Sequence, residues 1–146
     1  MPDNFFVASE RMYDSSKVLH ESNQFHNACY LAGYVLECYG KILIEKAMGG
    51  RPKDYGHDLR KMDTELGYFL TSSSAGGGSF RKYYFDSAVQ CPGLRGGMAG
   101  AGIDGWNPFN RYSDSVNWGQ IASGHFQNER EICFEKIVEM YIDGVI

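Results

Sequence analysis

The sequence contains few cysteines and none of the pairs in which cysteines usually bind metals. The four are Cys29, Cys38, Cys91 and Cys133. None forms a Cys-x-x-Cys pair, and Cys29 and Cys38 are nine residues apart, which places them on opposite sides of a helix. We therefore expect buried free thiols in a reducing compartment, with no metal site and no cofactor.

The chain also lacks a segment typical of secretion or membrane insertion. Residues Met1 to Asn4 contain no basic region followed by an apolar run, which a secretory signal requires. The nearest candidate for a membrane span, Ala28 to Ile44, is interrupted by Glu37 and Lys41, which cost too much free energy in lipid. These absences predict a cytoplasmic protein that does not enter a membrane.

Neither the charge nor the glycine pattern indicates a scaffold for nucleotides or nucleic acids. The formal net charge of -4 argues against a surface built mainly to bind phosphates. Gly100 to Gly105 matches the letters of a dinucleotide-binding glycine loop, but no predicted strand precedes it and Trp106-Asn107-Pro108 follows it. We interpret the match as coincidence in a glycine-rich segment.

Hydrophobic periodicity predicts an all-α fold in a single domain, residues 1–146. The first predicted helix begins at Asp3 or Asn4 and reaches about Leu19. Four further helices are predicted at about Phe25 to Met48, His57 to Leu70, Phe80 to Val89 and Ile121 to Ile142. Ser72 to Ser79 is predicted to be a loop, and Gln90 to Asn110 a long, irregular glycine-rich loop before the last helix. No segment alternates as a strand does, so we expect an antiparallel bundle of four to five helices.

The helix from Phe25 to Met48 is the expected centre of the bundle, because it is apolar on most of its circumference. Gly33 and Gly40 lie near one face, where they would let a neighbouring backbone approach. One small bundle would not cover so much apolar surface comfortably. We therefore expect a homodimer.

A polar stripe runs along this otherwise apolar helix. His26, Tyr30, Tyr34, Glu37 and Lys41 follow one another at steps of four, four, three and four residues, so they share one face. One interpretation is a partly exposed face with a Glu37–Lys41 ion pair. The other is a polar seam between helices or between subunits, in which these five residues form a binding or interface surface.

Three segments resemble the HEPN domain family. Asn27 to Cys38, followed by Lys41, resembles the core helix of HEPN domains, and Gly56-His57-Asp58-Leu59 is similar to the opening of the next helix. Trp106-x-Pro-x-x-Arg111-Tyr112-Ser113-Asp114 resembles the segment before the last helix. The resemblance implies a dimeric helical bundle, often encoded beside a minimal nucleotidyltransferase in toxin–antitoxin or other defence systems. It makes Arg111, Tyr112 and Asp114 candidate interface residues.

Many HEPN proteins are metal-independent ribonucleases that use an Arg, four to six residues and then a His near the start of the last long helix. This sequence departs from that pattern, because the three permitted positions after Arg111 hold Val116, Asn117 and Trp118. Arg51 and His57 satisfy the spacing, but in a different connection. In such a pair, the His would move the 2′-hydroxyl proton and the Arg would stabilise the phosphorane charge.

The sequence therefore favours a HEPN-like binding or regulatory module that acts through a homodimer and a partner protein, such as a nucleotidyltransferase. One alternative is a metal-independent ribonuclease that cleaves RNA with Arg51 and His57. A second alternative is a sensor in which the glycine-rich loop near Trp106 closes over a small ligand.

Overall fold

The computed structural model describes residues 3–72, 78–96, 105–106, 108 and 118–146, and its regular elements are all helical. The long helices are α1 (Phe5–Glu21), α2 (Phe25–Lys46), α3 (Leu59–Thr71) and α6 (Gln120–Ile142). The short ones are η1 (Pro52–Tyr55), η3 (Arg81–Tyr83), α4 (Ser87–Gln90) and α5 (Pro92–Arg95). The prediction of an all-α bundle is confirmed.

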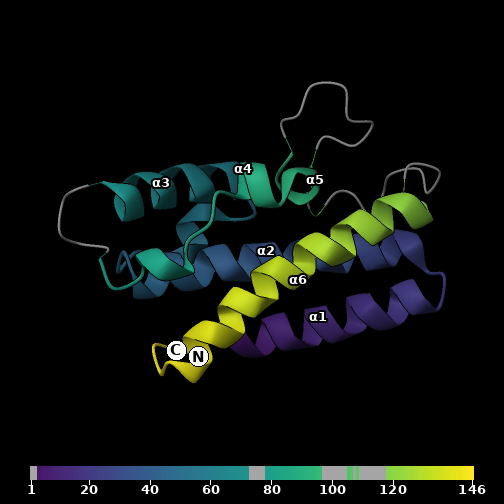
Figure 1. The fold of residues 1–146 in the computed structure, drawn as a ribbon, viewed down its shortest axis with the longest axis horizontal. Helices are drawn as coiled ribbons and strands as arrows, with labels where there is room; N and C mark the ends of the chain where they lie inside the picture. Colours follow the sequence, from purple (N-terminus) through teal and green to yellow (C-terminus); the bar gives the residue numbers. More distant parts are fainter. Residues whose placement is uncertain (1–2, 73–77, 97–104, 107, 109–117) are drawn as a thin grey trace.

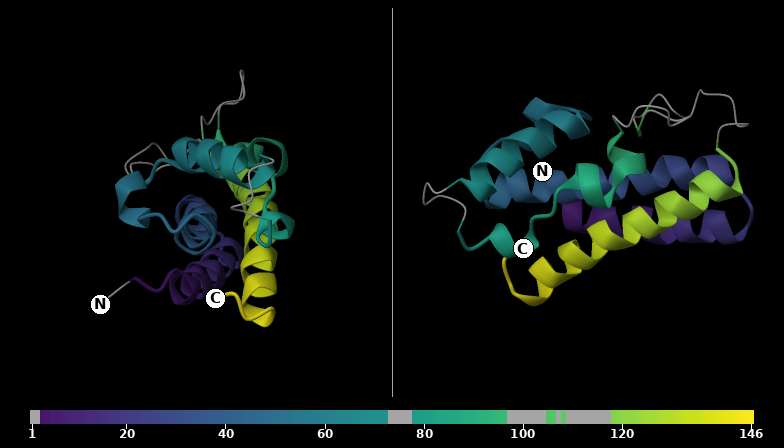
Figure 2. Two further views of the ribbon diagram at one scale, coloured as in Figure 1. Left: turned by 90° about the vertical axis from the view of Figure 1, so that its left-hand side faces the viewer. Right: turned by 45° about the horizontal axis from the view of Figure 1, so that its top comes forward.

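Helix α2 lies at the centre of this bundle. α1 and α2 form an antiparallel hairpin, and α6 packs across both of them (Figure 1). The view along α2 in Figure 2 places α1 on one side, α3 and the short helices on the opposite side, and α6 on a third. One chain therefore surrounds α2 with its own helices.

The burial of α2 corrects the argument by which a homodimer was predicted. Thirteen of its 22 residues are buried, including Val35, Leu43 and Ile44, which have no exposed surface. The apolar circumference is thus covered within the chain, at roughly 1.5 to 3 kcal/mol for each large aliphatic side chain removed from water. A homodimer would therefore have to form through another surface.

Side-chain caps determine where two of the helices begin. Asn4 Oδ1 accepts a hydrogen bond from the Val7 amide at 3.1 Å, and Asp58 Oδ1 accepts one from the Lys61 amide at 3.0 Å. Each bond satisfies an amide that has no partner within the helix. The third helix therefore begins at Leu59 instead of His57, and His57 lies in the turn before it.

The predicted helix from Phe80 to Val89 is wrong. Only Arg81–Tyr83 forms a helical turn, Tyr84 is extended, and a separate short helix starts at Ser87. The buried Tyr39 hydroxyl donates to the Tyr83 carbonyl at 2.9 Å and accepts from the Phe85 amide at 3.1 Å. These two bonds replace those that a continuous helix would make. The glycine-rich segment after it also departs from the predicted irregularity, because it includes α5.

Both helix glycines accommodate side chains, which corrects the prediction that a backbone would approach them. A Cβ at Gly33 would lie 2.1 Å from the Trp106 ring, and one at Gly40 would lie 3.3 Å from the Met62 sulfur. Trp106 comes from the segment after α5 and is 4% exposed. Gly33 therefore provides the space in which a distant indole ring packs on α2.

The cysteines are free and buried, as predicted. Burial raises the pKa of the Cys29 and Cys38 thiols to about 12, so both carry their protons at neutral pH. The Cys91 and Cys133 sulfurs lie 3.7 Å apart where α5 meets α6. Within the described ranges, no helix combines the length and the hydropathy needed to cross a membrane.

Candidate functional site

A cluster of charged side chains lies on α2 where the helix faces the turn before α3. The Lys41 ammonium is 2.6 Å from Glu37 Oε1, so the predicted i,i+4 ion pair is present. The His57 imidazole joins it through Nδ1, which lies 2.9 Å from each Glu37 oxygen. The side chain of Glu37 is 5% exposed, that of Lys41 12% and that of His57 51%. The buried Glu37 carboxylate thus binds the partly buried Lys41 ammonium and the accessible His57 imidazole.

The turn that carries His57 is built by local sequence. Pro52 favours the start of η1, and Gly56 has a positive φ of 55°, which turns the chain toward α3 at little steric cost. The Tyr55 hydroxyl bonds to the Glu65 carboxylate on α3 and fixes this turn on the helix that follows. His57 consequently reaches Glu37 although 20 residues separate them in sequence.

Aromatic side chains surround the cluster on one side. The rings of Tyr34 and Trp106 meet edge to face with centroids 4.7 Å apart, and each also contacts the edge of the His57 ring. The Trp106 indole N–H donates to the Tyr30 carbonyl at 2.7 Å, and the Tyr30 and Tyr34 hydroxyls lie 3.0 Å apart. The site therefore combines one accessible imidazole with aromatic surface.

The first residue of the predicted stripe lies away from this cluster. His26 stacks on Trp118, just before α6, with ring centroids 5.7 Å apart and the planes 5° from parallel. Trp118 in turn packs edge to face on Phe126. The structure thus brings Tyr30, Tyr34, Glu37 and Lys41 together with His57, whereas His26 contacts the start of the last helix.

The two residues of the predicted catalytic pair have different partners. The Arg51 guanidinium lies 3.7 Å from Asp54, and both side chains are exposed, whereas His57 binds Glu37. The other interface candidates, Arg111, Tyr112 and Asp114, lie outside the described residues, as does most of the Gly100–Gly105 motif.

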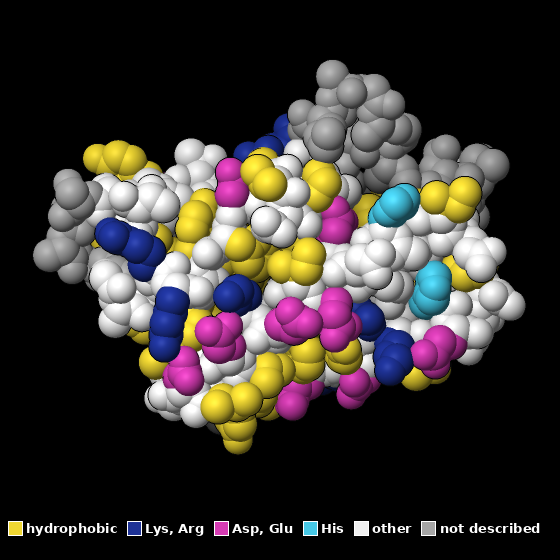
Figure 3. Space-filling model, in the orientation of Figure 1, with side chains coloured by type: hydrophobic (Ala, Val, Ile, Leu, Met, Phe, Trp, Pro, Cys, Tyr) yellow, Lys and Arg dark blue, Asp and Glu magenta, His cyan; other side chains and the backbone are white. Residues whose placement is uncertain are grey.

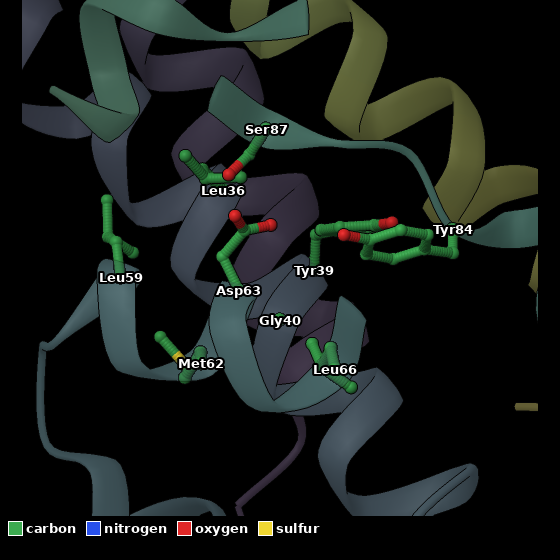
Figure 4. A pocket seen from close by; sticks show the side chains of 9 residues that line it. All are labelled: Leu36, Tyr39, Gly40, Leu59, Met62, Asp63, Leu66, Tyr84 and Ser87. Carbon is green, nitrogen blue, oxygen red and sulfur yellow. The ribbon is translucent and has the colours of Figure 1, made fainter. Parts of the chain in front are cut away.

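A small cavity between α2, α3 and α4 encloses Asp63 (Figure 4). Its volume of about 20 Å³ is close to the space that one water molecule needs. Burial raises the pKa of the Asp63 carboxyl, although the Ser87 hydroxyl and the Arg95 guanidinium oppose this shift. The cavity is too small for an organic ligand, and it lies beside a partly buried carboxyl.

At one end of the molecule, the large exposed hydrophobic side chains belong to α1 and α6. The sequence did not predict this exposed surface. Tyr141 on α6 is 55% exposed and stacks on Phe6 with ring centroids 4.5 Å apart. Ile142 and Val7 are 75% and 48% exposed. Figure 3 shows hydrophobic side chains along this lower edge, beneath a band of acidic ones.

Two shallow grooves open on this surface. The first, of about 410 Å³, lies between the start of α1 and the chain end beyond α6 and is lined by Phe5, Phe6, Ile42, Tyr141 and Ile146 among others. The second, of about 380 Å³, follows α6 from Glu131 to Ile142. Tyr141 lines the first groove and its neighbour Ile142 lines the second, so both grooves reach the end of α6. We name the two grooves together the α1–α6 face.

Across the described ranges, no three His, Cys, Asp or Glu side chains are grouped so that they could hold a metal ion.

Comparison of the chain with protein-family models, with curated proteins and with solved structures gives no match. The functional interpretation therefore rests on the chemistry of the chain's own residues.

Proposed function

We propose that this protein is a HEPN-like binding module that forms a homodimer and binds a partner protein. The resemblance supplies the class of partner: a nucleotidyltransferase or another component of a toxin–antitoxin or defence system. The sequence supplies the resemblance in three segments, and the helical bundle is compatible with it. The α1–α6 face supplies the physical basis for association.

One observation carries this proposal: the exposed hydrophobic side chains on the α1–α6 face adjoin two grooves. Tyr141 lines the first groove, Ile142 lines the second, and both side chains are more than half exposed. Grouped exposed apolar side chains that are bordered by charged ones are typical of a protein interaction site. Isolated exposed residues such as Val89 need no such explanation.

The first prediction concerns self-association. Light scattering should give a mass near twice 16.4 kDa at micromolar concentration. Tyr141→Asp should weaken the dimer by about tenfold or more, because it places a charge in an interface that excludes water. Tyr68→Asp on α3 is the matched control, since Tyr68 is 79% exposed and lies away from the face. A monomeric wild-type protein would contradict the homodimer.

A metal-independent ribonuclease is the second candidate, and the contact between Glu37 and His57 favours it. If Nδ1–H donates to the buried carboxylate, Nε2 is the nitrogen that can accept a proton. It would take the proton of an RNA 2′-hydroxyl, whose oxygen attacks phosphorus. The 5′-oxygen would then leave with that proton, giving a 2′,3′-cyclic phosphate and a 5′-hydroxyl. Arg51 supplies no charge here, because it pairs with Asp54.

The second prediction separates the two candidate functions. The purified protein should leave single-stranded and structured RNA intact, with or without a chelator. The Lys41 ammonium, which lies beside this site, is already paired with Glu37 and so is not available to stabilise the phosphorane charge. Gel analysis of a labelled RNA is the measurement. Chelator-resistant cleavage that His57→Ala reduces by about a hundredfold would favour the ribonuclease. In that event, Glu37→Gln should shift the pH–rate profile, because Glu37 positions the imidazole.

A further inference from the structure

We propose that the groove along α6 binds a basic amphipathic helix of a partner protein. This inference rests on the proposed function, since it names the chemistry of the partner that a binding module would take. The groove lies between α1 and the C-terminal half of α6, and we name it the α6 groove. Its apolar floor and its acidic border point to this occupant.

The floor of the α6 groove is aromatic and aliphatic. It is lined by Tyr13, Phe134, Val138 and Ile142, and its volume is about 380 Å³. The rings of Tyr13 and Phe134 stack with centroids 4.1 Å apart and planes inclined by 20°, so they form a firm surface. From Glu131 to Ile142, α6 extends roughly 16 Å, which matches about three turns of a docked helix.

Three carboxylates line the same groove at four-residue steps along α6. Glu131, Glu135 and Glu139 therefore lie on one face of the helix. Glu131 accepts a hydrogen bond from the Tyr13 hydroxyl, and Glu139 pairs with Lys136 at 3.3 Å. Glu135 is exposed to solvent.

Two cations near the border, Arg130 and Lys136, cancel part of this charge and leave that of Glu135. Arg130 is buried, lies 4.1 Å from the centre of the Tyr13 ring and donates to the Tyr13 carbonyl. It also pairs with the Glu131 carboxylate at 3.3 Å. Lys136 also bonds to the Lys82 carbonyl, which ties it to the neighbouring turn. The groove therefore presents net negative charge to an incoming chain.

Charge complementarity selects the occupant. A second copy that placed its own α6 groove on this one would bring two rows of carboxylates together, which costs free energy. Within the α1–α6 face, the proposed homodimer would therefore use the groove that Tyr141 lines. An amphipathic helix with Leu-type residues at i, i+3 or i+4 and i+7 would fill the apolar floor, and flanking Lys or Arg residues would meet the glutamates. Basic character in the partner would also speed its association.

Binding of a defined peptide tests this proposal with the full chain. The probe is a fluorescein-labelled helical peptide of about 18 residues, or about five turns of helix. It carries Leu on one face and Lys on the other. A peptide of the same composition in scrambled order is the probe control. Fluorescence anisotropy should show tighter binding of the amphipathic peptide, with affinity falling as salt is raised.

Matched variants locate the binding to the groove. Ile142→Lys should weaken binding by about tenfold, whereas Ile121→Lys, at the other end of α6 and 81% exposed, should leave it within about twofold. Glu135→Lys should weaken it by about threefold, whereas Asp54→Lys on η1 should not. All four positions are exposed, so folding is preserved, and circular dichroism checks it.

The outcomes distinguish this inference from the proposed function. Equal binding of the scrambled peptide, or unchanged binding by Ile142→Lys, would overturn the inference. A dimer that binds no peptide and that Ile142→Lys splits would assign the groove to a second copy, which also overturns it and leaves the homodimer in place. Peptide binding by a monomeric protein would support the inference and contradict the homodimer.

Discussion

Replacing Gly33 with alanine is expected to lower the free energy of unfolding by about 2 to 4 kcal/mol, because the new methyl group would displace Trp106 from α2. The added Cβ would stand 2.1 Å from the ring, far inside contact distance. The indole would also lose its bond to the Tyr30 carbonyl. Urea denaturation measures the loss, and a red shift of tryptophan emission reports the exposed ring.

Gly40→Ala is the matched control on the same helix. Its Cβ would lie 3.3 Å from the sulfur of Met62, a flexible side chain that can give way by a few tenths of an ångström. Alanine favours helix over glycine by about 1 kcal/mol, so this variant should be neutral or slightly more stable than the wild type. If Gly33→Ala behaved like Gly40→Ala, the packing of Trp106 on α2 would be disproved.

The second large effect is expected at Glu37, which holds the charged cluster together. Glu37→Ala leaves the Lys41 ammonium, whose side chain is 12% exposed, without its carboxylate partner. Such a broken buried pair typically costs about 3 to 5 kcal/mol of folding free energy. The measurement is again urea denaturation at neutral pH, where the slope of the transition should stay unchanged.

Two further variants show whether burial is the cause. Glu45→Ala removes an ion pair from the same helix, but Glu45 and Lys46 are 39% and 44% exposed, so the loss should stay within about 1 kcal/mol. Glu37→Leu combined with Lys41→Leu should regain most of the stability, because no buried charge is left unpaired. Equal losses for Glu37→Ala and Glu45→Ala would contradict a stabilising role for the cluster.

The parts of the fold that sequence could predict are those that depend on local periodicity. Apolar spacing identified α1, α2, α3 and α6, and the capping side chains Asn4 and Asp58 lie where helix starts were expected. The predicted helix at 80–89 failed because the bonds that break it come from Tyr39, more than 40 residues earlier. Local propensity carries no information about such a distant hydroxyl group.

The candidate site was predictable in part for the same reason. The Glu37–Lys41 pair follows from i,i+4 spacing on one helix. As a candidate catalytic residue, His57 was paired with Arg51, because the spacing between those two residues could be counted. Its contact with Glu37 depends on the turn at Gly56. The α1–α6 face escaped prediction because the exposure of Tyr141 depends on which helices pack beside it, and spacing along one helix does not give that.

The closed packing around the four cysteines turns them into internal reporters of motion. Each thiol is buried, two on α2 and two where α5 meets α6, so a thiol reagent reaches them only when the protein opens. The rate of alkylation at each position thus measures how often that part of the core becomes accessible. Cys29 and Cys38 report on the central helix, whereas Cys91 and Cys133 report on the contact between α5 and α6.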